Sequence, residues 1–284
     1  MRNTMLHIFR NSPLGRENLL QSAYFCKKHR GLSLKVYIPK TSLFSIDVGS
    51  DLFFLQLDAS YLQYPYSAEA HVKGILQSSN VSFTFVGPNE FDVGVKPHLP
   101  GSWSIIACPR VISEQSGRIG LGHLGPKVRG LVKAAYSPVF IPSLAHKEWT
   151  SVTAFFGGSS LGALSVKMAL AIARFSFVPA SVHTQLNGMT KAVCEKALSD
   201  AGILAAVSSA PVTWRLYDTG ELKENLYDVP HDSLVVVGAA GKNVIKELVF
   251  GSTLEAIQSA LPNPLVVVGP RCKPPWEELP KSSS

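Results

Sequence analysis

Three glycines near the end of the chain have the spacing expected of an anion-binding loop. Val235–Val237 predict a buried strand, Gly238 and Gly241 follow it, and nine residues separate Gly241 from Gly251 and its neighbour Ser252. Glycine lets backbone amides crowd around an anion, and a helix starting at Ser252 adds free N–H groups and the positive end of its dipole. The pattern suits a phosphate group. The alternative interpretation is a tight turn followed by a helix cap.

The pattern G-x2-G-x9-G-S resembles the nucleotide signature of the universal stress protein family. An apolar strand at 264–268 follows at the distance that this family shows, and the resemblance covers about residues 153–270. It implies a protein that binds ATP or AMP, with or without Mg²⁺, between the ends of its first two strands and the glycine loop. The implied role is that of a sensor or regulator in a stress response, and this role requires no catalytic turnover.

The resemblance also implies positions for the nucleotide. It places His183 and Thr184, at the end of the second strand, near the adenine. It places Lys242, in the glycine loop, near a phosphate. His183 alone also fits a packed core residue of an apolar strand. The complete predicted set is Gly157, Gly158, Ser159, His183, Thr184, Val237, Gly238, Gly241, Lys242, Gly251, Ser252 and Thr253.

One departure from the family lies at the end of the first strand. The family commonly has an aspartate there, in a pattern like V-D-x-S, whereas this chain has Gly157 in its second half and Arg10 in its first. A carboxylate contact to the nucleotide is therefore missing from both halves. This departure implies weaker binding or a different ligand.

Matching segments indicate an internal duplication. Phe9–Gly15 and Phe156–Gly162 share F-x-x-S-x-L-G, and the segments beginning at Gly125 and Gly251 match at an offset of 126 residues. Strands that alternate with helices in each half predict parallel sheets covered on both faces. Together with the resemblance, this predicts an α/β protein with two tandem Rossmann-like (HUP-type) domains, each a five-stranded, mainly parallel sheet with helices on both faces. The expected divisions are domains at 1–143 and 149–270, a linker at 142–148, and a disordered tail at 271–284.

The expected strands and helices follow the duplication. Helices are expected at 161–175, 189–201, 220–226 and 252–260, and the long connection at 40–66 is expected to add an edge strand at 53–57. The expected strands are 6–9, 32–38, 81–86, 103–108 and 139–141 in the first half, and 152–156, 180–184, 212–216, 234–237 and 265–268 in the second.

The first half lacks the nucleotide loop. Cys108–Arg110 replaces the first glycine, and Pro126 stands where the family has serine. The G-x-G-x-x-G at 120–125 comes about eleven residues after its strand, although that motif should follow the strand directly. We therefore expect a degenerate first domain, with this segment a flexible connector or a weak anion loop.

Two alternatives come from other functional classes. Residues 158–162 satisfy G-x-S-x-G between a strand and a helix, which is the setting of a serine hydrolase with Ser160 as nucleophile, Asp218 or Asp228 as its acid and His231 as its base. Asp228 and His231 are only three positions apart in the sequence, which leaves little room for the carboxylate to orient the histidine as a general base. The other alternative is a nucleotide-free interaction or dimerisation protein that pairs through the last strand of each half.

Composition limits the functional classes to which the protein can belong. The chain has 284 residues, 46% apolar and 17% charged, which supplies cores for two domains. Its net charge of +7 belongs to residues 1–143, which have 15 Lys or Arg against 8 Asp or Glu, without the interleaved aromatics of a nucleic-acid surface. Four scattered cysteines predict buried thiols, with no metal site or disulfide framework. Without an apolar leader or an uninterrupted apolar span, we expect a cytoplasmic protein with no membrane insertion. We also expect its two domains to pair within the chain, and homodimer formation stays open.

Overall fold

A computed structural model of the chain describes residues 3–47, 52–86, 98–99, 103–112, 124–239 and 252–273. The strands are β1 (Thr4–Ile8), β2 (Ser33–Tyr37), β3 (Leu43–Asp47), β4 (Leu52–Gln56), β5 (Phe83–Phe85), β6 (His98–Leu99), β7 (Ile105–Ala107), β8 (Val139–Ile141), β9 (Ser151–Phe155), β10 (Ala180–Gln185), β11 (Val212–Tyr217), β12 (Ser233–Gly238) and β13 (Leu265–Val268). The helices are α1 (Pro13–Lys28), α2 (Pro65–Ser79), α3 (Pro126–Ala134), α4 (Ser160–Ser176), α5 (Lys191–Asp200), α6 (Leu204–Val207), α7 (Leu222–Asn225) and α8 (Ser252–Ala260), with short 3₁₀ helices η1 (Ala59–Leu62) and η4 (Leu226–Asp228).

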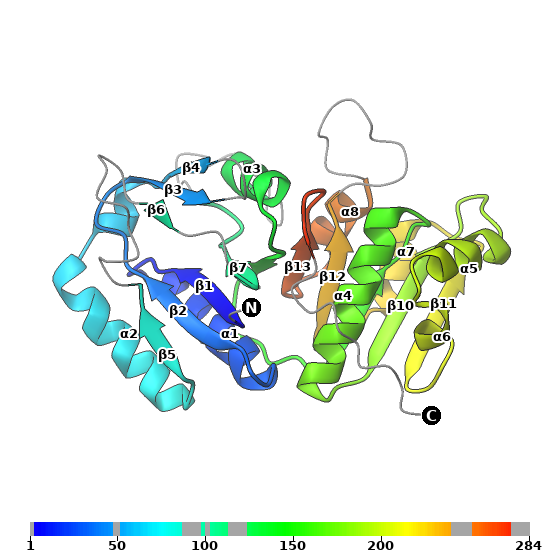
Figure 1. The fold of residues 1–284 in the computed structure, drawn as a ribbon, viewed down its shortest axis with the longest axis horizontal. Coiled ribbons are helices and arrows are strands. Elements are labelled where there is room, and N and C mark those ends of the chain that lie inside the picture. The colour runs from blue at the N-terminus through cyan, green and yellow to red at the C-terminus, as the bar shows by residue number, and fades with distance from the viewer. Residues whose placement is uncertain are drawn as a thin grey trace.

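Ten strands form one continuous sheet. Their order is β11-β10-β9-β12-β13-β8-β7-β1-β2-β5, so that each half of the chain contributes five strands in the same relative order. Neighbouring strands are parallel within each half, and β8 pairs with β13 in the antiparallel sense where the halves meet. Figure 1 shows the two halves side by side. The fold confirms the predicted α/β class with mainly parallel strands.

Helices cover both faces of the sheet because its strands are apolar on both sides. One core joins the face that carries Val152 and Ala154 to buried side chains of α1, α2, α4 and α5. The other joins the face of Phe155 and Val235 to side chains of α3 and α8. All four cysteines are buried thiols, as the sequence predicts.

The long connection of the first half contains the expected edge strand, but in a separate small sheet. β4 pairs with β3 in the antiparallel sense, and β3 pairs with β6, so that these strands form a separate three-stranded sheet. The expected edge strand at 53–57 is thus confirmed as β4, which lies at the edge of this separate sheet. The aromatic residues of this segment pack onto the second core, which explains the separate layer: Phe44 is buried there and Phe53 packs against it.

Several element boundaries also differ from expectation. The helix expected over 189–201 is α5, preceded by the cap Thr190 and followed by the separate α6. The helix expected over 220–226 is only the four-residue α7, because Glu221 caps it and the chain then tightens into η4. The matched helices α3 and α8 both have nine residues and differ by the predicted offset.

The segment between the two halves is fastened to α1. The Gln21 side chain accepts hydrogen bonds from the backbone N–H and the hydroxyl of Ser143 and donates one to the Ser143 carbonyl at 2.9 Å. At the other end of the C-terminal half, the backbone N–H of Lys273 donates to the carbonyl of Tyr136. Residues 271–273, which open the predicted tail, thus pack on the N-terminal half, and the rest of that tail lies outside the described residues. Among the described helices, none is both long and apolar enough to cross a lipid bilayer.

Candidate functional site

A glycine turn and a serine cap connect β9 to α4. Gly158 has a φ of +71°, which favours glycine, and the Ser159 side chain accepts a hydrogen bond from the N–H of Gly162 at 3.0 Å. A Cβ on Gly157 would have no atom within 4 Å, so that this residue borders open space. The repeated F-x-x-S-x-L-G motif is thus a helix entry, and Ser12 caps α1 in the same way through Gly15.

The carboxyl ends of β10, β9 and β12 are aligned at one edge of the sheet. His183 pairs with Phe155 and Val236 pairs with Ala154, so the register continues from Phe155 to Val237. His183, Phe155 and Val237 therefore form one row across three adjacent parallel strands. Open α/β sheets bind ligands beyond such an edge. The structure thus brings together the strand-end residues that the sequence predicts as a site.

His183 belongs to a polar network that fixes its tautomer. The Tyr217 hydroxyl lies 3.0 Å from an Asp228 carboxylate oxygen and 3.1 Å from the His183 Nδ1. Because an ionised carboxylate only accepts, the hydroxyl proton goes to Asp228 and Nδ1–H donates to the hydroxyl oxygen. Nε2 is then an acceptor, and within the described part of the chain this buried atom has no partner.

The environment keeps His183 uncharged. Burial, helped by the nearby Arg215 charge, lowers the pKa of His183 from its ordinary 6.5 to about 4, against the opposing effect of Asp228. The imidazole is therefore neutral at pH 7. A neutral ring whose buried acceptor nitrogen has no partner among the described residues suits an uncharged N–H donor on a ligand.

Thr184 has a different environment from its neighbour His183. Its side chain is fully buried, and its hydroxyl accepts a hydrogen bond from the indole N–H of Trp214 at 3.0 Å. Successive strand residues point to opposite faces, so the His183 and Thr184 side chains do not lie side by side. Of the two, only His183 has a buried polar atom without a partner in the described part of the chain.

Gly238 is explained by packing against α4. A Cβ there would lie 3.2 Å from Leu161 Cγ and 3.3 Å from Ser165 Oγ, so the glycine lets the helix approach β12 closely. The predicted site residues Gly241, Lys242 and Gly251 lie outside the described residues. Ser252 and Thr253 open α8, as predicted from the sequence, and the structure describes only their backbone.

The strand register rules out the triad of Ser160 and His231. Ser160 follows the carboxyl end of β9, whereas His231 precedes the amino end of β12, and these parallel strands pair Ser151 with Ser233. The two residues therefore lie at opposite ends of the strands. Asp228 is already bound by Tyr217 and lies 3.3 Å from the Arg215 guanidinium. The described residues also hold no group of three His, Cys, Asp or Glu side chains placed for a metal ion.

Sequence reasoning missed Tyr217 and Arg215. Both lie on β11, at the edge of the sheet, and neither belongs to a motif of the resemblance. The available signal is the alternation of Arg215 and Tyr217 near the end of a strand that pairs with β10. Two polar side chains in that position must face the same side as His183.

Solved structures similar to this chain share its tandem arrangement. A universal stress protein from Archaeoglobus fulgidus superimposes with a TM-score of 0.63 at 15% identity, covering 95% of this chain and 99% of that one. A putative universal stress protein from Pseudomonas aeruginosa gives 0.55 at 13% identity, covering 95% and 94%. The chain therefore has the universal stress protein fold. No family model matches the sequence, and no curated protein matches it either.

The same fold also occurs in another setting. The cytoplasmic domain of a prokaryotic cation chloride cotransporter superimposes with a TM-score of 0.51 at 11% identity, covering 94% of this chain and 95% of that domain. At such identities the likeness concerns the fold alone. The function of a universal stress protein fold must therefore be argued from its site.

Proposed function

We propose that this protein binds an adenine nucleotide, ATP or AMP, at the carboxyl ends of β9, β10 and β12, and acts as a stress-response sensor or regulator. The observation that carries the proposal is the row of His183, Phe155 and Val237 at one sheet edge, beside the open space at Gly157. The glycine-rich segment between β12 and α8 begins at this edge.

His183 gives the proposal a specific contact. Its Nε2 is a buried acceptor without a partner among the described residues. The exocyclic amino group of adenine is an uncharged donor of the kind that this atom needs. In the proposed complex, the adenine amino group donates to His183, and the phosphates lie toward the helix start at Ser252.

We propose regulation rather than catalysis because the polar groups at this edge are already engaged within the structure. The Asp228 carboxylate is held by Tyr217 and Arg215, and the Ser159 hydroxyl is used as a helix cap. These groups stabilise the structure, and we assign no reaction to them. A bound nucleotide shifts conformation or assembly through its differential affinity for two states.

Gly157→Asp provides the sharpest test because it is expected to increase binding. Open space surrounds the position, so the new carboxylate fits without displacing a neighbour and restores the residue that the resembled family carries there. A charge-assisted hydrogen bond to the ribose is expected to raise affinity for ATP or AMP about tenfold. Calorimetric titration measures the change.

Two variants at the same position complete the experiment. Gly157→Ala adds only a methyl group to the open space and is expected to bind as the wild type does, whereas Gly157→Phe fills that space and is expected to abolish binding. Equal nucleotide affinity in the wild type and all three variants would mean that the nucleotide binds elsewhere. Absence of binding in all four would reject the nucleotide and favour the interaction protein.

A further inference from the structure

Three elements of the C-terminal half contribute to a chain of hydrogen bonds that ends at His183. His183 lies on β10, Tyr217 on the neighbouring β11, and Asp228 in η4. The Tyr217 hydroxyl is the middle member, 3.1 Å from His183 Nδ1 and 3.0 Å from an Asp228 carboxylate oxygen. We call these three side chains the relay.

The relay has one direction because its middle member has one proton. Asp228 pairs with the Arg215 guanidinium at 3.3 Å, as an ionised carboxylate does, and such a carboxylate only accepts. Burial and the hydrogen bond to Asp228 raise the pKa of Tyr217, so its hydroxyl stays protonated at pH 7. The hydroxyl therefore donates to Asp228 and accepts from the Nδ1–H of His183.

Packing fixes the orientation of the imidazole ring. His183 is only 2% exposed, and the ring centroids of Phe155 on β9 and Tyr217 on β11 each lie 5.7 Å from its own. A flip of the ring would exchange its two nitrogens and break the hydrogen bond to Tyr217. The Nε2 atom is thus an acceptor with a fixed position.

An acceptor fixed in this way distinguishes two kinds of purine. His183 Nε2 is buried and has no partner among the described residues, and a buried polar atom left unpaired is costly. The amino group of a 6-aminopurine supplies the missing donor, whereas the carbonyl of a 6-oxopurine places a second acceptor against Nε2. Sites that bond a ligand N–H discriminate strongly against analogues that lack it.

We propose that Tyr217 and Asp228 are positioning residues that lock the tautomer of His183, so that the nucleotide site takes 6-aminopurines and rejects 6-oxopurines. The inference rests on the proposed nucleotide site and adds the origin of its selectivity. The hydrogen bond made by one ring nitrogen of a histidine sets which nitrogen carries the proton. Without the relay, Nε2 can carry the proton and donate to a carbonyl oxygen.

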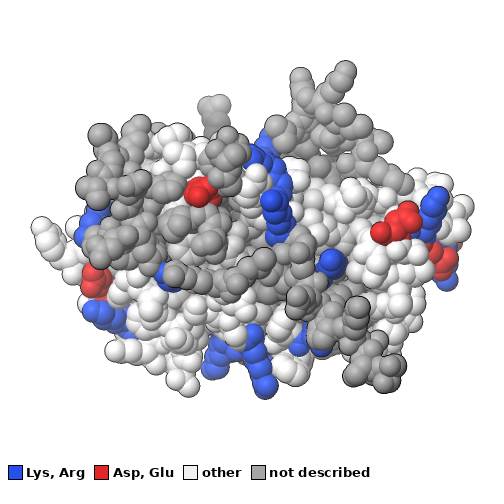
Figure 2. Space-filling view, viewed as in Figure 1, with Lys and Arg blue, Asp and Glu red and all other residues white. Residues whose placement is uncertain are grey.

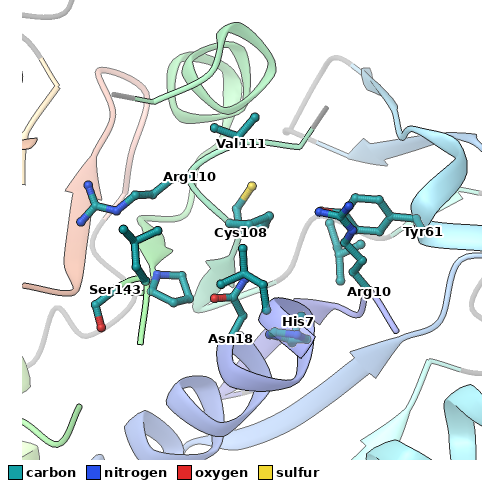
Figure 3. Close-up of a pocket in the computed structure, with 14 residues that line it drawn as sticks. His7, Arg10, Asn18, Tyr61, Cys108, Arg110, Val111 and Ser143 are labelled. Atoms are coloured by element: carbon teal, nitrogen blue, oxygen red, sulfur yellow. The ribbon is translucent and has the colours of Figure 1, made fainter. Parts of the chain in front are cut away.

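The N-terminal half has a different arrangement at the matched strand ends. Ile8 pairs with Tyr37 as Phe155 pairs with His183, so a phenol ring stands where the second half has an imidazole. Figure 3 shows the neighbouring strand end of this half, where Arg10 lies beside Tyr61. Neither Tyr37 nor Arg10 can present a ring-nitrogen acceptor. The inferred selectivity therefore belongs to the C-terminal half.

The test is calorimetric titration of the full chain with three nucleotides that differ in the base. ATP carries the amino group, ITP a carbonyl oxygen in its place, and purine riboside triphosphate only hydrogen. The wild type is expected to bind ATP about tenfold more tightly than either analogue, because each leaves Nε2 unpaired.

Two conservative variants remove the lock. Tyr217→Phe keeps the ring and deletes the hydroxyl, and the preference for ATP over ITP is expected to fall to about threefold or less. Asp228→Asn is expected to act in the same sense, because an amide can donate to the Tyr217 oxygen as well as accept from it.

Two matched variants serve as controls. Glu195→Gln also removes a partly exposed carboxylate from an ion pair, here with Lys191 at 3.5 Å on α5. Figure 2 shows acidic and basic side chains together over α5, at the right-hand end of the molecule. Tyr61→Phe also removes a tyrosine hydroxyl, in the N-terminal half. Both are expected to keep the wild-type preference for ATP.

A spectroscopic readout tests the relay without any nucleotide. At pH 7 the pKa of about 4 leaves His183 neutral, so the ¹⁵N shifts of its two ring nitrogens report the tautomer. The wild type is expected to carry the proton on Nδ1, and Tyr217→Phe to share it between the two nitrogens. A wild-type ring with its proton on Nε2 would overturn the inference.

The titrations separate this inference from the proposed function. Equal affinity of the wild type for ATP and ITP, or an unchanged preference in Tyr217→Phe, would overturn the tautomer lock and leave the nucleotide site in place. Absence of nucleotide binding by the wild type would reject the proposed function and the selectivity with it.

Discussion

After the first strand of each half, four residues lead into a capped helix, and these two passages can be compared atom by atom. In the N-terminal half the passage carries Arg10, whose guanidinium lies over Tyr61 beside a cavity. In the C-terminal half it carries Gly157, which borders open space. The same topology therefore presents a cation in one half and room for a ligand in the other. Duplication preserved the scaffold, while the residues at the strand ends diverged.

The largest expected difference between the halves concerns the glycine in the first turn of each capped helix. A Cβ on Gly15 would lie 1.9 Å from the Arg10 carbonyl oxygen, whereas the nearest atom to one on Gly162 is the Ser159 hydroxyl at 3.1 Å. Gly15→Ala should therefore lower the free energy of unfolding by about 3 kcal/mol, because backbone must move. Gly162→Ala should change it by less than about 1 kcal/mol, since alanine also favours the helix. Urea unfolding of both variants measures the contrast, and equal losses would contradict it.

Acid sensitivity provides the second comparison. Burial lowers the pKa of His7 to about 3, and burial with the Arg215 charge lowers that of His183 to about 4. The unfolded chain binds protons near pH 6.5 and the folded one does not, so stability is full above pH 6.5 and falls as the pH drops toward 4. Each histidine accounts for about 3 kcal/mol of that loss by pH 4.

The histidine variants separate the two halves. His7→Gln or His183→Gln should start with lower stability at pH 7 but lose about 3 kcal/mol less than the wild type between pH 7 and pH 4. Urea unfolding at a series of pH values measures both differences. An unchanged pH dependence in either variant would mean that its histidine is already solvated in the folded protein.

The third comparison concerns the residues just before the last strand of each half. Asn263 donates through Nδ2 to the carbonyls of Pro230, His231 and Ser233, whereas Ser137, at the matched position, donates to the carbonyl of Trp103. Asn263→Ala leaves more buried carbonyls without a partner and should cost about 2 kcal/mol, against about 1 kcal/mol for Ser137→Ala. Thermal unfolding ranks the two, and the reverse order would contradict this account.

The sequence predicted most of this fold because its signals were local and repeated. Apolar runs gave the strands, and the matched positions 125 and 251 gave α3 and α8 at the same offset. It did not predict β3 or β6, because β6 has only two residues and pairs with a distant segment. Strand pairing across a long connection depends on tertiary packing, which a local sequence pattern does not predict.

The site was predictable in outline and not in detail. Alternation along apolar strands placed His183 and Val237 at the same edge, since their strands flank β9. The tautomer of His183 depends on Tyr217 and Asp228, which lie 34 and 45 positions further along the chain. The cavity beside Arg10 likewise needs Tyr61 from η1, which reaches it only through the fold. Contacts between distant elements decide the chemistry at the strand ends of both halves.

The smallest expected effects concern the Arg215–Asp228 ion pair at the edge strand β11. Both side chains are about half exposed, at 46% and 51%, so Arg215→Ala should lower stability by less than about 0.5 kcal/mol. The His183 pKa is the more sensitive readout, because Arg215 lowers it and Asp228 raises it. NMR titration should therefore show a higher His183 pKa in Arg215→Ala and a lower one in Asp228→Asn. Shifts of the same sign in both variants would mean that the charges do not act on the ring directly. The network would then act on the ring only through the position of Tyr217.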